Sequence, residues 1–246
     1  MARSSLFTIG NQNQPRLFYR THKVIQTLAG YTITYKGEEL RQDDEDVFLQ
    51  LVHLARNHVL GEKVEFTAFS FLTELGWKRS VEGYNRLKAT LDRLQGTGLR
   101  ISSDGGNDAG FQGALVRAFM WRDSSDAPLA RWQVFLEPQI IKLFGKNEYT
   151  HVFWDQRLRL RSSIAKYLHG YYASHEFPYP ISVQRLKGLT GSSVTRLTDF
   201  RKSLRRGLDQ LVTEGFLDKW NIDAGDLVHV VRKPKPRRVQ AEREAA

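Results

Sequence analysis

The stretch "SSVTRLTDFRKSLRRGLDQLVTEGFLDKW", residues Ser192 to Trp220, mixes large apolar side chains with basic ones at helical spacing. Its apolar residues recur at steps of three or four, which is the period of one face of an α-helix. They are Leu197, Phe200, Leu204, Leu208 and Leu211. The pattern predicts a helix from Ser193 to Glu214 whose apolar stripe faces a protein core.

The opposite face of this predicted helix is basic. Such a face is typical of a helix that lies in the major groove of DNA, where its first residues reach base edges and Arg is the usual partner of guanine. The residues expected to bind DNA are Ser193, Thr195, Arg196, Asp199, Lys202, Ser203 and Arg206, with Arg201 and Arg205 on the flanks. The alternative is a solvated helix face that binds no ligand.

An earlier part of the chain repeats the leucine pattern. Leu87, Leu91, Leu94, Gly98 and Leu99 align with Leu204, Leu208, Leu211, Gly215 and Phe216 at a constant offset of 117 residues. Leu72 and Leu75 align with Leu186 and Leu189 at an offset of 114 residues. Self-similarity at a nearly fixed spacing predicts two copies of one structural unit.

Each copy reads as a short helix, a turn and a longer helix, which is expected to end at Gly98 or Gly215 because glycine is the usual C-cap residue. A β-ribbon follows each, and it is expected to bend at Asp104 to Gly110 in the first copy and at Ala224-Gly225 in the second. A further helix precedes each unit, Asp43 to His58 and Ser162 to Glu176.

These elements predict an α+β fold of two tandem winged-helix domains related by an internal repeat. We expect a flexible N-terminal arm over residues 1–20, a first domain over 21–145, a second over 146–234 and a basic disordered tail over 235–246. The tail is interpreted as a phosphate-gripping arm or as a solubilising tail with no fixed contact.

The first copy has a helix predicted from Ser80 to Gln95, whose outward residues resemble those of the second copy. The outward set is Arg79, Asn85, Arg86, Lys88 and Arg93, of which the first four are expected to contact DNA. Glu82 and Asp92 dilute this charge, so the second copy is expected to carry more of the DNA affinity. Asp43 and Asp44, at a helix start, are interpreted as capping residues rather than catalytic ones.

Composition agrees with a polyanionic partner. The 246 residues include 37 Lys and Arg against 27 Asp and Glu, for a net charge of +10. There is no cysteine, no apolar run long enough to span a bilayer and no apolar signal-peptide core in the first residues, so a cytoplasmic protein is expected.

Catalysis has no visible signature, so we expect a protein that is not an enzyme and uses no cofactor or metal. A phosphate-cradling loop ending in Gly-Lys-Ser/Thr is missing, and "FGKNE" at Phe144 to Glu148 lacks both its spacing and its hydroxyl. The seven histidines are dispersed, and Tyr167, Tyr171 and Tyr172 are interpreted as packing residues because no base or metal site accompanies them.

The segments "YTITYKGEELRQDDEDVFLQLVHLAR" and "LRLRSSIAKYLHGYYASHEFPYPISVQRLKGLTGSS", with the basic helix after them, resemble the TrfA-type plasmid replication initiators from about Leu6 to Val231. The resemblance implies a bacterial cytoplasmic protein, associated with nucleoid or plasmid, that binds direct repeats called iterons at the plasmid origin. It also implies origin opening, recruitment of the host replicative helicase and host initiator, copy-number control, and a homodimer in equilibrium with a DNA-binding monomer. In such initiators the N-terminal domain generally dimerises.

Two questions remain open, one about the N-terminal segment and one about the function of the whole chain. "RSSLF", Arg3 to Phe7, is similar to the pentapeptide that binds the β sliding clamp, with Leu6 and Phe7 as the inserted side chains; the alternative is that both residues dock on the protein itself. For the whole chain, the alternatives are a winged-helix transcriptional repressor and a DNA-processing enzyme.

Overall fold

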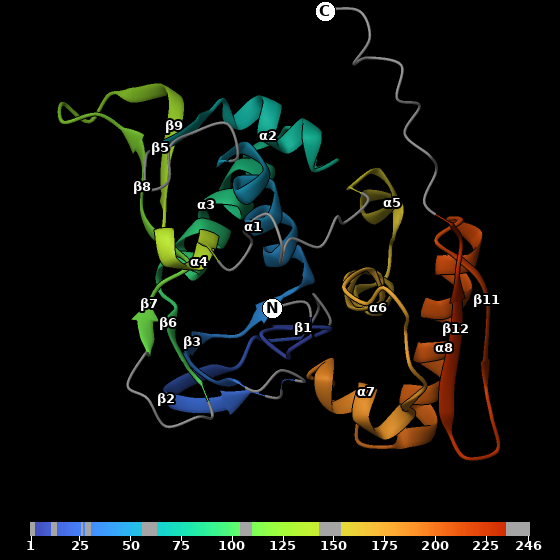
Figure 1. The fold of residues 1–246 in the computed structure, drawn as a ribbon. Helices are drawn as coiled ribbons and strands as arrows, with labels where there is room; N and C mark the ends of the chain where they lie inside the picture. The colour runs from blue at the N-terminus through green and yellow to red at the C-terminus, as the bar shows by residue number, and fades with distance from the viewer. Residues whose placement is uncertain are drawn as a thin grey trace, which may run out of the picture.

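The computed structural model describes residues 3–10, 14–25, 27, 31–55, 63–103, 110–142 and 154–234 (Figure 1). The helices are α1 (Gln42–Ala55), α2 (Ala68–Glu74), α3 (Val81–Gln95), α4 (Pro138–Lys142), α5 (Trp154–Arg159), α6 (Ser163–Ala173), α7 (Val183–Leu189) and α8 (Leu197–Thr213). The strands are β1 (Phe7–Thr8), β2 (Phe18–Ile25), β3 (Tyr31–Glu38), β4 (Leu40–Arg41), β5 (Lys63–Phe66), β6 (Gly98–Ser103), β7 (Phe111–Gly113), β8 (Val116–Arg122), β9 (Pro128–Leu136), β10 (Ile181–Ser182), β11 (Leu217–Ile222) and β12 (Leu227–Arg232). The chain therefore has a mixed α+β fold.

Two hydrophobic cores organise these elements, one in a first unit that ends with α4 and one in a second unit from Leu160 to β12, and Trp154 of the connecting helix α5 packs against the first core. Figure 1 shows the two units side by side, with α1 and α6 near their boundary. The predicted division at residues 145 and 146 falls between Leu143 and Phe153, outside the described residues. The predicted tail over 235–246 lies outside them as well.

The second unit follows the order α6, β10, α7, α8, β11, β12, and its strands form a sheet in the order β10-β12-β11. Local chemistry starts two of these helices, because the hydroxyls of Ser162 and Ser182 accept hydrogen bonds from the backbone N–H of Ala165 and Arg185. Gly215 ends α8 with a φ of +74°, as expected for a glycine just after a helix.

The first unit repeats this order as α1, β5, α2, α3, β8, β9, with β6 and β7 inserted between α3 and β8, and its sheet order β5-β9-β8 matches that of the second unit. The buried positions also correspond. Those of α3 are Gly83, Leu87, Thr90, Leu91 and Leu94, and those of α8 are Phe200, Leu204, Gly207, Leu208 and Leu211, again 117 residues apart. The repeat inferred from the leucines is therefore present in the packing of both helices.

The first β-ribbon was predicted at the wrong place. β6 and β7 do pair, with Ile101 opposite Phe111, but they join β2 and β3 in a separate four-stranded sheet of order β2-β3-β6-β7. The hairpin that corresponds to β11–β12 is β8–β9, which turns at Asp123–Ala127. The misleading glycine-rich bend lies at residues 104–110, of which the structure describes only Gly110.

The two hairpin turns share one construction. Asp123 and Asp223 each accept a hydrogen bond at Oδ1 from the backbone N–H four residues later, at 3.0 and 2.9 Å. Asp126 and Asp226 each adopt a positive φ, 65° and 59°. The repeat thus extends into the hairpins, although its offset there differs from that of the helices.

Gly98 does not cap α3. The C-cap is Gly96, and Gly98 instead begins β6, where it lies opposite Lys36 of β3. A Cβ atom at Gly98 would lie 3.2 Å from the Lys36 Cβ, so this glycine permits a close approach between strands rather than a helix end.

The expectation of a flexible N-terminal arm is wrong for residues 3–10. Leu6 and Phe7 are both 3% exposed, and β1 pairs in parallel with β4. The segment lies between the units: Phe7 stacks on Phe48 of α1, while the backbone N–H of Ile9 donates to the carbonyl of Thr190. Docking of Leu6 and Phe7 on the protein itself is the alternative that the structure supports, because burial withdraws both side chains from a clamp pocket.

A buried ionic network joins the two units. Arg157 of α5 is 1% exposed, and its guanidinium donates to Asp46 at 2.7 Å, to Glu45 at 3.0 Å and to the Lys166 carbonyl at 3.1 Å. Burial opposes the charge of Arg157, but Asp46 and Glu45 outweigh it and raise the pKa of Arg157 above its ordinary value. A charge buried at this depth is tolerated because each of its partners is in place.

Candidate nucleic-acid interface

Helix α8 is held so that one face is buried and the other is exposed. Its five buried residues pack against α6 and the hairpin, and Gly207 allows α6 to come close, since a Cβ there would lie 3.0 Å from Ile164 Cγ2. The predicted start of the helix at Ser193 is four residues too early. Ser193 and Thr195 lie in the connection before the helix, and Arg196 is its N-cap.

The connection before α8 is fixed at both ends. Gly191 takes a φ of +61°, and a Cβ atom there would lie 2.7 Å from Thr8 Cγ2, so only glycine suits this turn. The ammonium group of Lys187 on α7 donates to the carbonyl of Thr195 at 3.1 Å. The first turn of α8 therefore has a defined position relative to α7.

The structure brings together the predicted residues of the second unit on or beside the outward face of α8. The exposed ones are Ser193, Thr195, Arg196, Asp199, Lys202, Arg205 and Arg206, whereas Arg201 and Ser203 are half-buried. Lys202 and Asp199 form only a loose, exposed ion pair of 3.7 Å. The side chains on this face thus offer mainly positive charge to a ligand.

Arg201 differs from its neighbours because it is held from the side. Its Nε and Nη2 donate to the two carboxylate oxygens of Asp226 in the β11–β12 turn, at 3.0 and 2.9 Å. This hydrogen-bonded pairing raises the pKa of Arg201 above its ordinary value. Asp226 is not among the residues predicted from the sequence, although the Asp-x-x-Asp pattern shared by the two turns is a signal that points to it.

The first unit places fewer of its predicted residues at the surface. Arg79 and Asn85 are exposed, and Arg79 lies over the Phe69 ring with its guanidinium 4.9 Å from the ring centre. Lys88 is half-buried above Trp121 and Trp132, 5.1 and 5.8 Å from their ring centres. These cation–π contacts stabilise Arg79 and Lys88 in place, but the rings also shield part of their charge from a ligand.

Two arginines of α3 are committed to internal ion pairs. Arg86 lies over Trp77 and pairs with Asp43 at 3.3 Å. Arg93, predicted to point outward, donates two hydrogen bonds to Oδ1 of Asp44, at 3.0 and 2.8 Å. The prediction for Arg93 is wrong because a buried carboxylate at the start of α1 needs a cationic partner.

Asp43 and Asp44 lie in the first turn of α1, and both form ion pairs with arginines. Asp44 accepts the backbone N–H of Arg41 at 2.8 Å, which is the helix-start contact that was expected. It also accepts Arg16 Nη1 at 2.6 Å. Burial opposes ionisation of Asp43, but Arg16 and Arg86 outweigh it and lower the pKa of Asp43 below its ordinary value.

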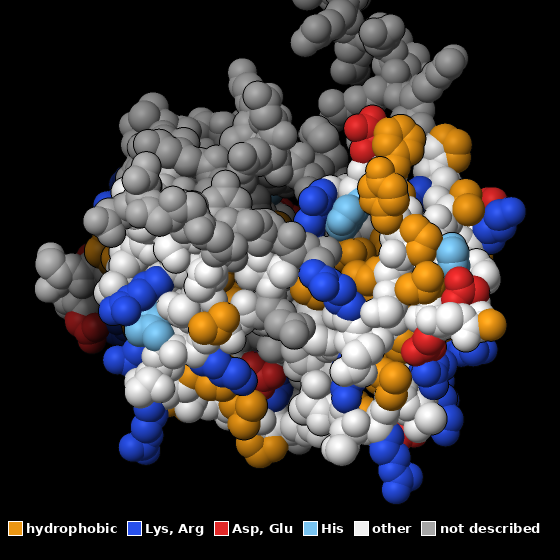
Figure 2. All heavy atoms as spheres, turned by 60° about the horizontal axis from the view of Figure 1, so that its bottom comes forward, with side chains coloured by type: hydrophobic (Ala, Val, Ile, Leu, Met, Phe, Trp, Pro, Cys, Tyr) orange, Lys and Arg blue, Asp and Glu red, His pale blue; other side chains and the backbone are white. Residues whose placement is uncertain are grey.

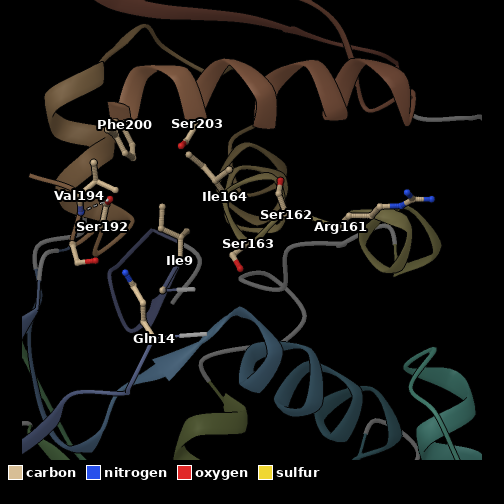
Figure 3. Close-up of a pocket in the computed structure, with 12 residues that line it drawn as sticks. Ile9, Gln14, Arg161, Ser162, Ser163, Ile164, Ser192, Val194, Phe200 and Ser203 are labelled. Carbon is tan, nitrogen blue, oxygen red and sulfur yellow. Dashed lines mark hydrogen bonds between the residues drawn. The ribbon is translucent and has the colours of Figure 1, made fainter. Parts of the chain in front are cut away.

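A cavity of about 600 Å³ lies between α8, the start of α6 and the N-terminal segment (Figure 3). Phe200 and Ser203 project into it from α8, Ser162 and Ser163 come from the start of α6, and Gln14 comes from the N-terminal segment. Ser192 and Ser193 line it from the connection before α8, so small hydroxyl side chains form much of its wall.

Basic and apolar side chains share the exposed surface. In Figure 2 the Lys and Arg side chains are spread over the face turned forward, and hydrophobic side chains lie among them. Phe177 and Tyr179 in the loop after α6 are 75% and 80% exposed, and Phe18 and Val24 on β2 are each 66% exposed. Among the described residues, no group of three or more His, Asp or Glu could hold a metal ion, and no helix could cross a bilayer.

The chain is similar in sequence to a known protein family and to one of its curated members. The family model described as "TrfA protein" matches residues 1–232. The chain is 30% identical over 233 residues to the "Plasmid replication initiator protein TrfA" of Escherichia coli. The aligned region covers 94% of this chain and 60% of that relative. The chain thus spans about 60% of the length of the curated relative that it matches.

Two solved structures of RctB domains 2 and 3 are similar in fold. The first, of selenomethionine derivatives, has a TM-score of 0.66 at 12% identity and covers 93% of this chain and 95% of that one. The second, of residues 155–483, has a TM-score of 0.61 at 14% identity with the same coverage. At these identities the likeness concerns the fold alone.

Proposed function

The chain belongs to the TrfA family, and from this premise we propose that it is a plasmid replication initiator that binds double-stranded DNA at an origin through α8. The observation that carries the proposal is the outward face of α8, where basic side chains gather opposite a buried apolar stripe. A helix held in this way can enter a major groove while its cations meet base edges and phosphates.

We further propose that both units are winged helices arranged in tandem. The order helix, strand, helix, helix and hairpin occurs in each, with the same sheet order. In this reading α8 is the recognition helix of the second unit, and the β11–β12 hairpin beside it is the wing. α3 and the β8–β9 hairpin are their counterparts in the first unit.

The second unit is proposed to carry more of the DNA affinity. Arg86 and Arg93 of α3 are engaged by Asp43 and Asp44, so they have less charge to offer a phosphate than the exposed Arg205 and Arg206 of α8. The first unit is left with backbone contacts through Arg79, Asn85 and Lys88, and in the same proposal it also forms the dimer.

The family premise supports iteron repeats as the DNA target, with opening of adjacent DNA and recruitment of the host helicase and host initiator as later steps. Phe177 and Tyr179 are exposed aromatic side chains of the kind that anchor protein partners, and they offer a place for such recruitment. We propose that the protein acts by assembling partners and distorting DNA, without catalysis of its own.

Strand β2 offers a place for a second copy of the chain. It is an outer strand of the sheet β2-β3-β6-β7, and its Phe18 and Val24 are exposed. An outer strand with apolar side chains can pair with another strand, which supports the proposed homodimer in equilibrium with a monomer.

A footprint of the protein on its parent plasmid's origin, with excess competitor DNA, tests the proposal. We expect protection of regularly spaced direct repeats. Arg196→Ala and Lys202→Ala should each weaken binding to the repeats by about 1–3 kcal/mol if the residue reads a base. Arg159→Ala, which removes an exposed arginine of α5 outside the α8 face, is the charge-matched control and should leave the footprint unchanged.

Three results would redirect the proposal. A single protected palindrome over a promoter would favour the winged-helix repressor. Replication of a plasmid carrying the repeats without this protein would exclude an initiator. Nicking of supercoiled origin DNA in the presence of a divalent metal would identify a DNA-processing enzyme.

A further inference from the structure

The turn between β11 and β12 is held in place by several hydrogen bonds. The backbone N–H of Asp226 donates to the carbonyl of Asp223 at 3.1 Å, and the Asp226 carbonyl accepts from Val183 at the start of α7 at 3.0 Å. The second carboxylate oxygen of Asp223 pairs with His229 Nε2 at 2.7 Å. The Asp226 carboxylate is therefore presented to α8 from a fixed backbone.

The Asp226 carboxylate accepts hydrogen bonds from only one edge of the Arg201 guanidinium. Nε and one N–H of Nη2 donate to Asp226. A guanidinium has five N–H groups in one plane, so both groups of Nη1 and one of Nη2 remain for a further ligand. Their fork matches two adjacent acceptors, as in the N7 and O6 atoms of guanine in the major groove.

The pairing also favours a base over a phosphate as that ligand. Asp226 neutralises much of the Arg201 charge, and its carboxylate would repel a phosphate that approached closely. Arg205 and Arg206 are more exposed and have no described carboxylate partner, so they suit phosphates better. A guanidinium whose plane is fixed before binding selects a ligand by the direction of its hydrogen bonds rather than by its charge.

The first unit contains the same turn without this link. Asp126 has nearly the same φ as Asp226, but its carboxylate pairs with Arg122 on its own hairpin at 3.1 Å. The α3 residue that matches Arg201 is Tyr84, which cannot form the pair. The turn conformation accounts for an aspartate at this position in both units. Only in the second unit does the carboxylate of that aspartate pair with the long helix.

We propose that Asp226 is a positioning residue that holds Arg201 to read a guanine in the DNA target. This inference rests on the proposed function, because it requires α8 to lie in a major groove. It adds that the hairpin contributes to sequence selection through a side chain that does not itself touch the DNA.

The test compares Asp226→Asn and Arg201→Lys with the parent protein. Asn also accepts a positive φ, so the turn is retained while the charge that orients Arg201 is removed. Asp126→Asn makes the same change in the matching turn of the first unit and is the control. Binding is measured at one salt concentration to the origin repeat, to a random duplex, and to a panel in which each G·C pair of the repeat is replaced by A·T.

In the parent protein, one particular G·C replacement is expected to weaken binding by at least about tenfold. Asp226→Asn and Arg201→Lys should both lose most of this discrimination at that same base pair. Binding of Asp226→Asn to the random duplex should not fall, because a negative charge has been removed. Asp126→Asn should keep the panel of the parent.

An Asp226→Asn panel identical to that of the parent would overturn the inference. So would an equal loss on every duplex, since that points to a role in the turn alone. If instead Lys202→Ala and Arg206→Ala bind every duplex as tightly as the parent protein does, α8 is not the DNA-binding element. That result would contradict the proposed function itself, and not only the role of Asp226.

Discussion

At the scale of single residues, His169 is a buried group with no use in the proposed interface. It is fully buried against Phe216, and neither ring nitrogen has a hydrogen-bond partner among the described residues. Burial, together with Arg157 and Arg232, lowers the pKa of His169 to about 3. His169→Phe would replace the imidazole with a ring that does not ionise and that suits the contact with Phe216.

This burial predicts a pH dependence of stability. The unfolded chain binds a proton at His169 near the ordinary pKa of about 6.5, whereas the folded chain does not until pH falls to about 3. The free energy of unfolding should therefore fall by about 1.4 kcal/mol per pH unit below pH 6.5 through this residue alone. Denaturant titrations at several pH values should show a shallower slope for His169→Phe, and parallel curves for the two proteins would contradict the prediction.

At the scale of elements, the packing of α8 on α6 depends on Gly207. A Cβ at this position would lie 3.0 Å from Ile164 and 3.3 Å from Leu168, so a branched side chain would force the helices apart. We expect Gly207→Val to lower the free energy of unfolding by about 1–3 kcal/mol, although removing glycine from a helix is by itself favourable. Thr198→Val, on the exposed face of the same helix, should change stability little. Equal melting temperatures for both variants would show that the helices have room to adjust.

At the scale of the whole molecule, the two units are coupled through Arg157. Replacing it with Met leaves Asp46 and Glu45 buried with fewer partners, so we expect a loss of about 3–5 kcal/mol in the free energy of unfolding. Arg159→Met, two residues away, breaks a pair that is half exposed and should cost at most about 1 kcal/mol. Denaturant unfolding of both variants, followed by circular dichroism, checks the difference.

Hydrogen exchange would locate the effect of Arg157→Met. If the network joins the units, amides of α1, α5 and α6 should lose protection before those in the interior of either core. Loss confined to α5 would show instead that Arg157 stabilises only its own helix.

Helices and their repetition could be predicted from the sequence because their signals are local. The apolar stripe of α8, the matching leucines of α3 and the start of α3 at Ser80 all depend on neighbours within a few positions along the chain. The basic character of the outward α8 face follows from the same periodicity. The order of the elements in the second unit, including its hairpin bend near Gly225, was also correct.

What only the tertiary structure decided are contacts between distant residues. Leu6 and Phe7 looked like the end of a free arm until two units were seen to enclose them. Glycines at residues 104–110 resembled the first hairpin turn, but the strand pairing belongs to β8–β9. Arg93 and Arg201 have the same local signature as any exposed arginine, and their partners Asp44 and Asp226 lie 49 and 25 positions away. Helical periodicity specifies which face of α8 is outward, whereas the choice of partner for each charge depends on the packing of the whole chain.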